Sequence, residues 1–356
     1  MKENNTNLSN NCSTRQLKIA VIIPVFNTEK YLAECLDSLL NQNYGNFIAY
    51  IIDDGSTDSS GKIIDAYARK DSRIIAIHQS NKGVSAARNV ALNLICSNSS
   101  IDIVCLLDSD DILTPQSFQT LATTFHKHKV DFVLAGYVGF NKKGIIPNHK
   151  KIDHAPLELE GKEIFDFVLG SDKYFKRSSP AFSVFIGNYY FSPHLINEIR
   201  FDESKQTCED QDFRFKTLLN AKKGVAISDI TFLYRSRKSS LSHSGFRATD
   251  DINMLNSWFK LYPTISDDIK PSIETFAVTC WWSSLRRAAA LNLLDCTYTE
   301  FSKCLTTMRK IFISEALENP KVKKRLFLFS LGKTPLKLYL SFQGNFLDKK
   351  LADSFE

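Results

Sequence analysis

The sequence lacks the marks of a disulfide-bonded, zinc-binding or membrane-spanning protein. Its eight cysteines include no Cys-x-x-Cys pair, and several lie in apolar runs, which favours reduced thiols in a core over disulfides or zinc. No apolar run approaches the ~20 residues that cross a bilayer. Residues 1–17 are rich in Asn and Ser, contain no apolar segment typical of a signal peptide, and predict a disordered lead-in. These absences predict a cytoplasmic protein.

Strong charge of one sign is also absent, except in one short segment. The 356 residues carry a formal net charge of +6. No nucleic-acid-binding module is recognisable, so we expect no nucleic acid partner. Residues 321–340 combine basic with large apolar side chains and contain no acid. This segment is either a helix packed on the protein with its lysines in solvent, or an interfacial helix that docks on anionic lipid at the inner face of the cytoplasmic membrane.

The sequence does contain a regular alternation of strand and helix patterns. Buried β-branched runs predict strands, and apolar residues at helical spacing predict helices between them. The short connections require right-handed crossovers and predict an α/β fold, a mainly parallel sheet with helices on both faces. The predicted strands are 18–25, 47–52, 74–77, 101–107 and 130–136, and the predicted helices are 29–41, 58–70, 84–95 and 115–127.

The second half of the chain is less regular and then becomes helical. Between residues 138 and 235 the pattern predicts one helix at 162–169 and strands through 182–191 and 225–234. From about residue 250 the apolar spacing is helical. The change of composition near residue 249 predicts a boundary between an α/β domain and a helical C-terminal region.

Polar motifs follow the predicted strands where these strands end, which is the edge of a parallel sheet at which ligands bind. A carboxylate there can accept hydrogen bonds from a base or a ribose, and an arginine one turn into a helix can bind an anion. Each motif also has a structural alternative as a turn, a helix cap or a solvated side chain. The motifs are Pro24-Val25-Phe26-Asn27, Asp53-Asp54-Gly55-Ser56-Thr57-Asp58, Asn81-Lys82-Gly83 with Ala86-Ala87-Arg88-Asn89, and Asp108-Ser109-Asp110-Asp111.

The fourth motif is the most informative, because an apolar run leads directly into three carboxylates. In an extended chain, Asp108 and Asp110 point to the same side. One or two such carboxylates, completed by phosphate and water, suit Mg²⁺ or Mn²⁺. The ion would neutralise charge on a departing diphosphate. The alternative is capping of the helix expected near Pro115, which needs one acid and best explains Asp111.

Two later segments add a candidate base and a candidate phosphate-binding loop. Glu209-Asp210 stands at a helix start, where acids either interact with the helix dipole or supply a general base that takes a proton from an attacking hydroxyl. Residues 234–243 form a basic, hydroxyl-rich loop. This loop either folds over a diphosphate or is simply solvated.

In this order and spacing, the motifs resemble family 2 glycosyltransferases of the GT-A fold, the type that builds bacterial surface polysaccharides such as O-antigen. The resemblance covers roughly residues 18–242. It implies a catalytic domain over 18–249, with a nucleotide-binding half at about 18–140 and an acceptor half at about 141–249, followed by a helical region at 250–356. Cys208 and Gln211, on either side of the Glu-Asp pair, depart from the family pattern and bear on acceptor fit.

The resemblance also implies a reaction and a role for each motif. The reaction is inverting transfer of a hexose or N-acetylhexosamine from a UDP-sugar to a hydroxyl of a glycan, often one linked to undecaprenyl diphosphate, which gives a β-linkage. Asp210 would be the catalytic base and Glu209 would position the acceptor. Asp110 would bind Mn²⁺ or Mg²⁺, with Asp108 and His243 as further candidates. The donor contacts would be Pro24, Val25, Phe26, Asn27, Asp54, Arg88, Asp108, Ser109, Arg235 and Ser242.

Two other functions compete with this interpretation. A sugar nucleotidyltransferase is disfavoured because no Gly-rich loop with a Lys or Arg follows the first strand. A non-catalytic nucleotide- or glycan-binding subunit is disfavoured because the acids expected for the metal site and for the base are all present.

Overall fold

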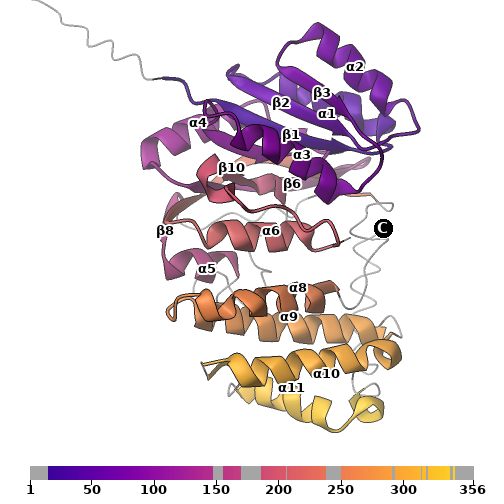
Figure 1. The fold of residues 1–356 in the computed structure, drawn as a ribbon, viewed down its shortest axis with the longest axis vertical. Coiled ribbons are helices and arrows are strands. Elements are labelled where there is room, and N and C mark those ends of the chain that lie inside the picture. Colours follow the sequence, from indigo (N-terminus) through magenta and orange to yellow (C-terminus); the bar gives the residue numbers. More distant parts are fainter. Residues whose placement is uncertain are drawn as a thin grey trace, which may run out of the picture.

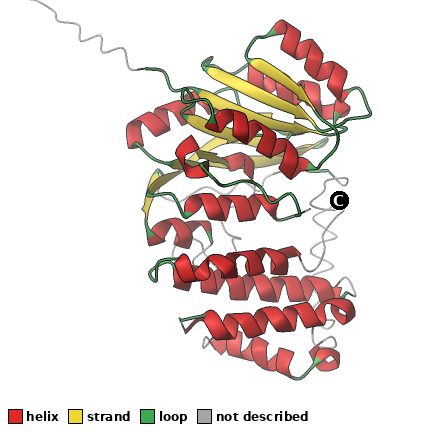
Figure 2. Ribbon diagram, viewed as in Figure 1, coloured by secondary structure: helices red, strands yellow, loops and turns green. Residues whose placement is uncertain are grey.

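The structure is a computed structural model, and it describes residues 15–146, 155–169, 186–205, 207–237, 250–290, 293–313, 315–317, 320–336 and 340. Figure 1 shows a sheet with helices on both of its sides at one end of the long axis, and a stack of helices at the other end. Figure 2 shows the same division by element type, with the strands gathered in the first part and helices alone in the second. The predicted α/β fold with a helical C-terminal region is therefore confirmed.

A ten-stranded sheet has the strand order β3-β2-β1-β4-β9-β6-β10-β5, with β7 paired to β6 and β8 paired to β10. β1 pairs in parallel with β2 and β4, β2 with β3, and β6 with β10, whereas β9 is antiparallel to both β4 and β6. The sheet is thus mixed but mostly parallel. Its strands are β1 (Ile19–Val25), β2 (Phe47–Asp53), β3 (Ile74–His78), β4 (Ile103–Leu106), β5 (Ile112–Leu113), β6 (Phe132–Asn141), β7 (Gly144–Ile146), β8 (Leu157–Glu160), β9 (Tyr189–Phe191) and β10 (Lys223–Arg235).

Alternation along β1 explains how helices cover both faces of the sheet. Ile19, Val21 and Ile23 belong to one apolar cluster with residues of α1 and α4, whereas Ala20 and Ile22 belong to a second cluster with residues of α3 and α6. Because successive side chains of a strand point to opposite faces, a strand buried on both sides is apolar throughout. The helices are α1 (Glu29–Leu40), α2 (Ser60–Lys70), α3 (Val84–Cys96), α4 (Ser117–His128), α5 (Lys162–Val168) and α6 (Glu209–Leu218).

The predicted bounds of α1 to α5 lie within two residues of the observed ones, but two strands differ more. β6 continues to Asn141 because it pairs along its length with β10 and then forms a hairpin with β7. The strand predicted over 182–191 is a strand only at Tyr189–Phe191, which a short 3-10 helix at Ile186–Asn188 precedes. Residues 182–185 lie outside the part that the structure describes.

The C-terminal part consists of α8 (Asp250–Leu261), α9 (Lys270–Ala290), α10 (Leu294–Ile311) and α11 (Pro320–Ser330). Its core is continuous with the sheet, because one apolar cluster contains residues of α3, of α6 and of all four of these helices. Phe215 of α6 stacks on Trp258 of α8, with ring centroids 3.8 Å apart. Helices α6 and α8, on either side of the boundary predicted near residue 249, therefore pack against each other. That this boundary separates two domains stays a prediction.

The basic segment predicted at 321–340 has one packed and one exposed side. Phe329 is 5% exposed and its ring packs against Trp281 and Tyr298, and Leu336 is fully buried. Phe327 is 61% exposed and Leu331 is 48% exposed. Among the described residues, none of the helices has the length and apolar character needed to cross a membrane.

Candidate active site

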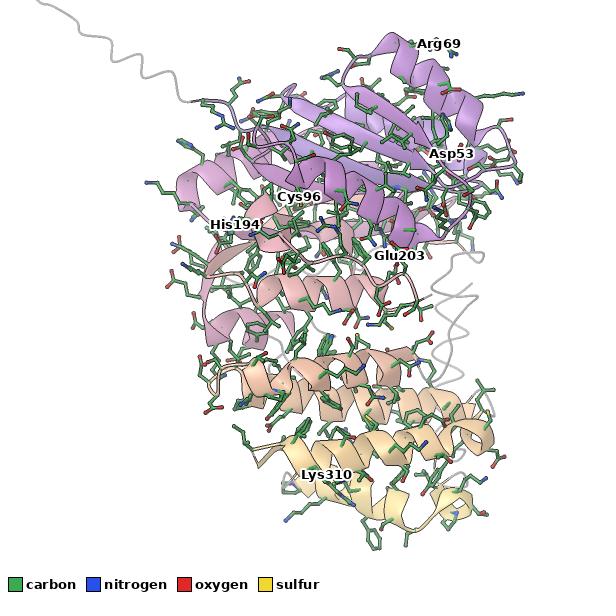
Figure 3. All side chains as sticks on the ribbon, in the orientation of Figure 1. Asp53, Arg69, Cys96, His194, Glu203 and Lys310 are labelled. Atoms are coloured by element: carbon green, nitrogen blue, oxygen red, sulfur yellow. The ribbon has the colours of Figure 1, made fainter. Side chains whose placement is uncertain are left out.

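The site lies where β1, β2 and β4 end, opposite the first turn of α6. Figure 3 labels Asp53, the last residue of β2, and Glu203, which precedes α6, on the right-hand side of the view. Cys96, at the far end of α3, is labelled nearer the middle of the view. The carboxyl ends of the parallel strands therefore face the segment that leads into α6, as expected for a ligand site in this kind of sheet.

The loops after β1 and β2 are tied together by Asn27. This residue adopts a left-handed φ of 52°, which Asn tolerates better than most residues. Its side-chain oxygen accepts hydrogen bonds from the backbone N–H of Thr57 (2.8 Å) and of Asp58 (3.3 Å), and its own N–H donates to Ser56 Oγ (3.1 Å). The neighbouring Phe26 is 47% exposed. Asn27 thus has a structural role, and Phe26 has an exposed aromatic side chain directly after β1.

Asp54 is 3% exposed and its carboxylate is largely engaged within the protein. It accepts hydrogen bonds from Gln79 Nε2 (2.7 Å), from the Lys82 N–H (2.9 Å) and from the Gly83 N–H (2.8 Å). Gly83 has a φ of 92°, which favours glycine, and it begins the approach to α3. A carboxylate has about four acceptor positions. Three are used here, so the predicted contact with the donor base has one position left and stays a prediction.

The acidic motif forms a turn, so the predicted extended geometry is wrong. β4 ends at Leu106, and the N–H of Asp111 donates to the carbonyl of Asp108 (3.0 Å). The Asp108 side chain is 41% exposed, whereas Ser109 is buried and its hydroxyl accepts a hydrogen bond from Thr28 Oγ1 (3.1 Å). Asp108 therefore faces the site, and Ser109 faces the start of α1.

Asp111 does not cap a helix, and that part of the prediction is wrong. α4 begins at Ser117, and its cap residue Gln116 makes no side-chain cap hydrogen bond. The buried Asp111 instead accepts a hydrogen bond from the backbone N–H of Arg235 (2.8 Å). Burial, Asp108 and Asp110 raise the pKa of Asp111 well above its ordinary value. Asp111 thus joins the acidic turn to the end of β10.

Asp110 is balanced by an arginine that the sequence analysis did not single out. Arg237 Nε lies 2.7 Å from Asp110 Oδ2, and its guanidinium lies over the ring of Tyr31. Burial and Asp108 raise the pKa of Asp110, and Arg237 opposes them. The signal in the sequence is the pair of basic residues Arg235 and Arg237, which predicts a basic loop but not its acidic partner.

Arg235 itself is anchored in the fold rather than in a free loop. Its Nε donates to the carbonyl of Asp110 (2.7 Å), its Nη2 donates to Glu34 Oε2 (2.5 Å), and its guanidinium lies over the rings of Tyr31 and Phe140. It therefore holds the acidic turn in place, and a contact with the diphosphate stays a prediction. Ser242 and His243 lie outside the residues that the structure describes.

Arg88 joins the acidic turn to the predicted base. It is 4% exposed, its Nη2 donates to Asp108 (2.9 Å), and its Nη1 donates to Glu209 (3.0 Å), which comes 121 residues later in the chain. Its guanidinium also lies over the Phe201 ring. Burial opposes its charge, yet Asp108, Glu209 and Asp210 raise its pKa above the ordinary value. Arg88 therefore stays charged and holds two predicted site residues in one arrangement.

Asn89, next to Arg88, fixes the segment before α6. Its side chain exchanges hydrogen bonds with the backbone of Phe201, accepting from the N–H (2.8 Å) and donating to the carbonyl (3.0 Å), and it also donates to Glu203 (2.9 Å). The sequence predicts no role for Asn89, although this residue belongs to the motif at the start of the third predicted helix. Arg88 thus binds Glu209 in the first turn of α6, and its neighbour Asn89 binds Phe201 in the segment that leads to this turn.

Asp210 has the environment of a general base. It lies half-buried in the first turn of α6, next to Glu209. Burial and Glu209 raise its pKa from 3.8 to about 7, although Arg214 and Arg88 oppose the change. A base works best when its pKa lies near the working pH. The structure therefore brings together Asp108, Asp110, Arg88, Glu209 and Asp210.

A divalent cation fits the acidic turn. Among the described residues, no three His, Cys, Asp or Glu side chains are grouped as a complete metal site. Asp108 and Asp110 do supply two carboxylates, and their crowding helps to raise the pKa of Asp110. Mg²⁺ and Mn²⁺ in phosphate-binding sites take one or two protein carboxylates and complete their shell with phosphate and water. The donor set fits such an ion.

Sequence comparisons place the chain among glycosyltransferases. Residues 20–179 match the model of glycosyl transferase family 2. The chain is 32% identical over 308 residues to glycosyltransferase GlyG of Streptococcus pneumoniae serotype 4, a match that covers 85% of this chain and 98% of GlyG. It is 33% identical over 241 residues to glycosyltransferase GlyA of the same organism, which covers 63% of this chain but spans only 31% of GlyA.

A solved structure shares the fold. The crystal structure of S. aureus TarS residues 1–349 in complex with UDP-GlcNAc has a TM-score of 0.66 at 22% identity, covering 84% of this chain and 83% of that chain. By sequence, poly(ribitol-phosphate) β-N-acetylglucosaminyltransferase TarS of Staphylococcus aureus is 27% identical over 227 residues, covering 62% of this chain and 36% of TarS. The match to nearly the whole of GlyG goes beyond a likeness of fold, and the chain therefore belongs to glycosyltransferase family 2.

Proposed function

We propose that this chain is an inverting glycosyltransferase that moves a hexose or N-acetylhexosamine from a UDP-sugar to a hydroxyl of a glycan in bacterial surface polysaccharide synthesis. The observation that carries the proposal is the bridge that Arg88 makes between Asp108 and Glu209, because it holds the acidic turn beside Glu209 and the adjacent Asp210, whose pKa is raised. The complex of the similarly folded TarS with UDP-GlcNAc supports a nucleotide-sugar donor.

The proposed reaction is a single displacement. Asp210 takes the proton of the acceptor hydroxyl while that oxygen attacks the anomeric carbon. The bond from this carbon to the diphosphate oxygen breaks, and UDP leaves with the electron pair. Attack from the face opposite the leaving group converts an α-linked donor into a β-linked product. In this proposal Glu209, which is held by Arg88 beside Asp210, orients the acceptor.

A bound Mn²⁺ or Mg²⁺ would be held by Asp110, with Asp108 beside it, and would supply neutralisation of charge on the diphosphate. The chain's own residues keep these acids in position. Arg235 binds the backbone carbonyl of Asp110, and Asp111 binds the backbone N–H of Arg235. The turn is thereby fastened to the end of β10 at Asp110 and at Asp111.

Incubation with a panel of UDP-sugars, Mn²⁺ and short glycan acceptors tests the proposal. We expect UDP release that depends on the acceptor, and a product that gains one sugar by mass spectrometry. Pyrophosphate formed from UTP and a sugar phosphate would identify a nucleotidyltransferase instead. UDP binding without turnover of any donor would identify a binding subunit.

The proposal includes docking of α11 on an anionic membrane. On this helix, Lys324 and Phe327 are exposed about one turn apart, and Lys323 is exposed beside them. Leu331, the residue after the helix, is also exposed. Large apolar side chains with lysines and no acid suit the interface of an anionic bilayer. Such docking would bring the enzyme to a lipid-linked acceptor.

Sedimentation with vesicles that contain phosphatidylglycerol tests this surface. We expect binding to the intact chain, and loss of binding after truncation before Pro320 or in Lys324→Glu, with UDP release from a soluble acceptor unchanged. Lys62→Glu on α2, at the opposite end of the molecule in Figure 1, makes the same change of charge and serves as the matched control. Equal sedimentation of Lys324→Glu and the intact chain would refute the docking surface.

A further inference from the structure

The residue before the Glu-Asp pair has a backbone conformation that needs support. Cys208 has a φ of 59°, in the left-handed region, and it is the residue from which α6 begins. Residues other than glycine adopt this region at a cost in free energy and keep it only where the surroundings enforce it. The direction in which Glu209 and Asp210 leave this turn therefore depends on whatever holds Cys208.

Two acids at the start of α8 hold this turn. Cys208 Sγ donates to Asp251 Oδ1 (3.3 Å), and Thr207 Oγ1 donates to Asp250. The other oxygen of Asp251 accepts a hydrogen bond from Ser284 of α9, so the acid is itself fixed. Burial and Asp251 raise the pKa of Cys208, which keeps the thiol protonated and able to donate.

Helix α8 also contacts α6 on the C-terminal side of Asp210. Asp212, which is 1% exposed, accepts a hydrogen bond from Trp258 Nε1 (3.2 Å), and Phe215 stacks on the same indole. Figure 1 shows α6 between the sheet and α8. Helix α8 thus contacts α6 before and after Asp210, whereas Arg88 and Asp108 approach from the side of the sheet.

We propose that α8 is a positioning element of the transfer reaction, in which Asp251 and Asp250 hold the left-handed turn at Cys208 and so set where Asp210 meets the acceptor. This inference rests on the proposed function, in which Asp210 is the base. It gives the helical C-terminal region a part in catalysis that does not require contact with either substrate.

The inference predicts a separation of kcat from KM. Asp251→Ala removes the acceptor of the Cys208 thiol, so the turn is free to leave the left-handed region. We expect kcat to fall on the order of 10- to 100-fold, the effect of a small misplacement of a catalytic group. The KM for the UDP-sugar should stay unchanged, because none of the described residues that we assign to the donor lies on α6 or α8. Asp251→Asn keeps one side-chain acceptor and should lose less.

A second substitution tests the backbone argument directly. Glycine adopts a positive φ without steric cost, so Cys208→Gly in the Asp251→Ala background should recover kcat several-fold. A general loss of packing would not be repaired in this way. Asp267→Asn, at an acid of the same region whose side chain is 83% exposed, is the control and should leave both constants unchanged.

The outcomes separate this inference from the proposed function. If Asp210→Asn transfers sugar at the normal rate, Asp210 is not the base and the proposed function fails. If Asp210→Asn is inactive but Asp251→Ala has normal kcat, only the positioning role of α8 fails. A fall in kcat that Cys208→Gly does not repair, or one that comes with an equal rise in the KM for the UDP-sugar, also overturns it.

Discussion

The raised pKa of Asp210 predicts that its charge destabilises the fold. Folding raises this pKa from 3.8 to about 7, so the folded state binds the proton more tightly than the unfolded state. Below the ordinary pKa the carboxyl is protonated in both states and the effect vanishes. Between the two values the fold loses stability as pH rises, and above about 7 the full cost is present. Replacing Asp210 by Asn should therefore stabilise the protein at high pH.

The size of the effect follows from the same two values. Each pKa unit corresponds to ~1.4 kcal/mol, so the difference between 3.8 and about 7 sets an upper limit of about 4 kcal/mol. Asp210 is only half-buried and water screens part of its charge, so we expect about 1–3 kcal/mol at pH 8 and a smaller gain at pH 5. For a chain of this size, the gain corresponds to about 1–4 °C in Tm.

Thermal unfolding of the intact chain and of Asp210→Asn at pH 5 and pH 8 measures this gain. The Asn variant should melt higher, with the larger difference at pH 8, and it should release no UDP from donor and acceptor. The activity of the intact chain should rise with pH through about 7, because only the ionised carboxylate can act as a base. Asp267→Asn, at an exposed acid, should change neither property. A Tm difference that is equal at the two pH values would refute the reasoning.

Other substitutions test the remaining parts of the site. Asp110→Ala should lose the Mn²⁺-dependent part of UDP affinity, and equal affinities with and without Mn²⁺ in both proteins by titration calorimetry would contradict the metal assignment. Arg88→Met leaves Asp108 and Glu209 without their buried partner and should cost about 3–5 kcal/mol in urea unfolding, whereas Met replacing an exposed arginine such as Arg69 should cost almost nothing. Asp111→Asn keeps an acceptor for the Arg235 N–H and should retain transfer, whereas Asp111→Ala should raise the KM for the UDP-sugar, and equal KM values would contradict the anchoring role.

The sequence could predict the helices and strands whose positions are set by the local pattern of apolar residues. The predicted helices α1 to α5 lie within two residues of the observed ones, because apolar spacing and short loops define them without reference to distant residues. The strand predicted over 182–191 includes β9, but its partners were not predicted. Three residues, Tyr189–Phe191, are inserted between β4 and β6 in antiparallel orientation. The local pattern predicts a strand here but not its neighbours, since the pairing depends on where two other strands already lie.

The same limit applies to the site. Strand ends identified the loops that carry Asn27, Asp54 and Asp108, because parallel strands deliver their ends to one edge. The sequence could not predict which groups these residues contact. Asp54 turned out to hold the backbone before α3, and Asp111 the end of β10, both through hydrogen bonds across the fold. Asp and Asn motifs in a sequence indicate where a site lies, but a carboxylate that binds its own backbone and one that faces a ligand look alike.

The bridge made by Arg88 connects these observations to function. A buried guanidinium is stable here only because two acids, from opposite sides of the site, share its charge. Binding of a cation at the acidic turn would draw negative charge away from Arg88 on one side, and deprotonation of Asp210 would add it on the other. The two halves of the site are therefore coupled electrostatically through one side chain. Arg88→Lys, which keeps the charge but cannot reach both acids with a planar fork, should uncouple them: UDP affinity should then depend less on whether residue 210 is Asp or Asn.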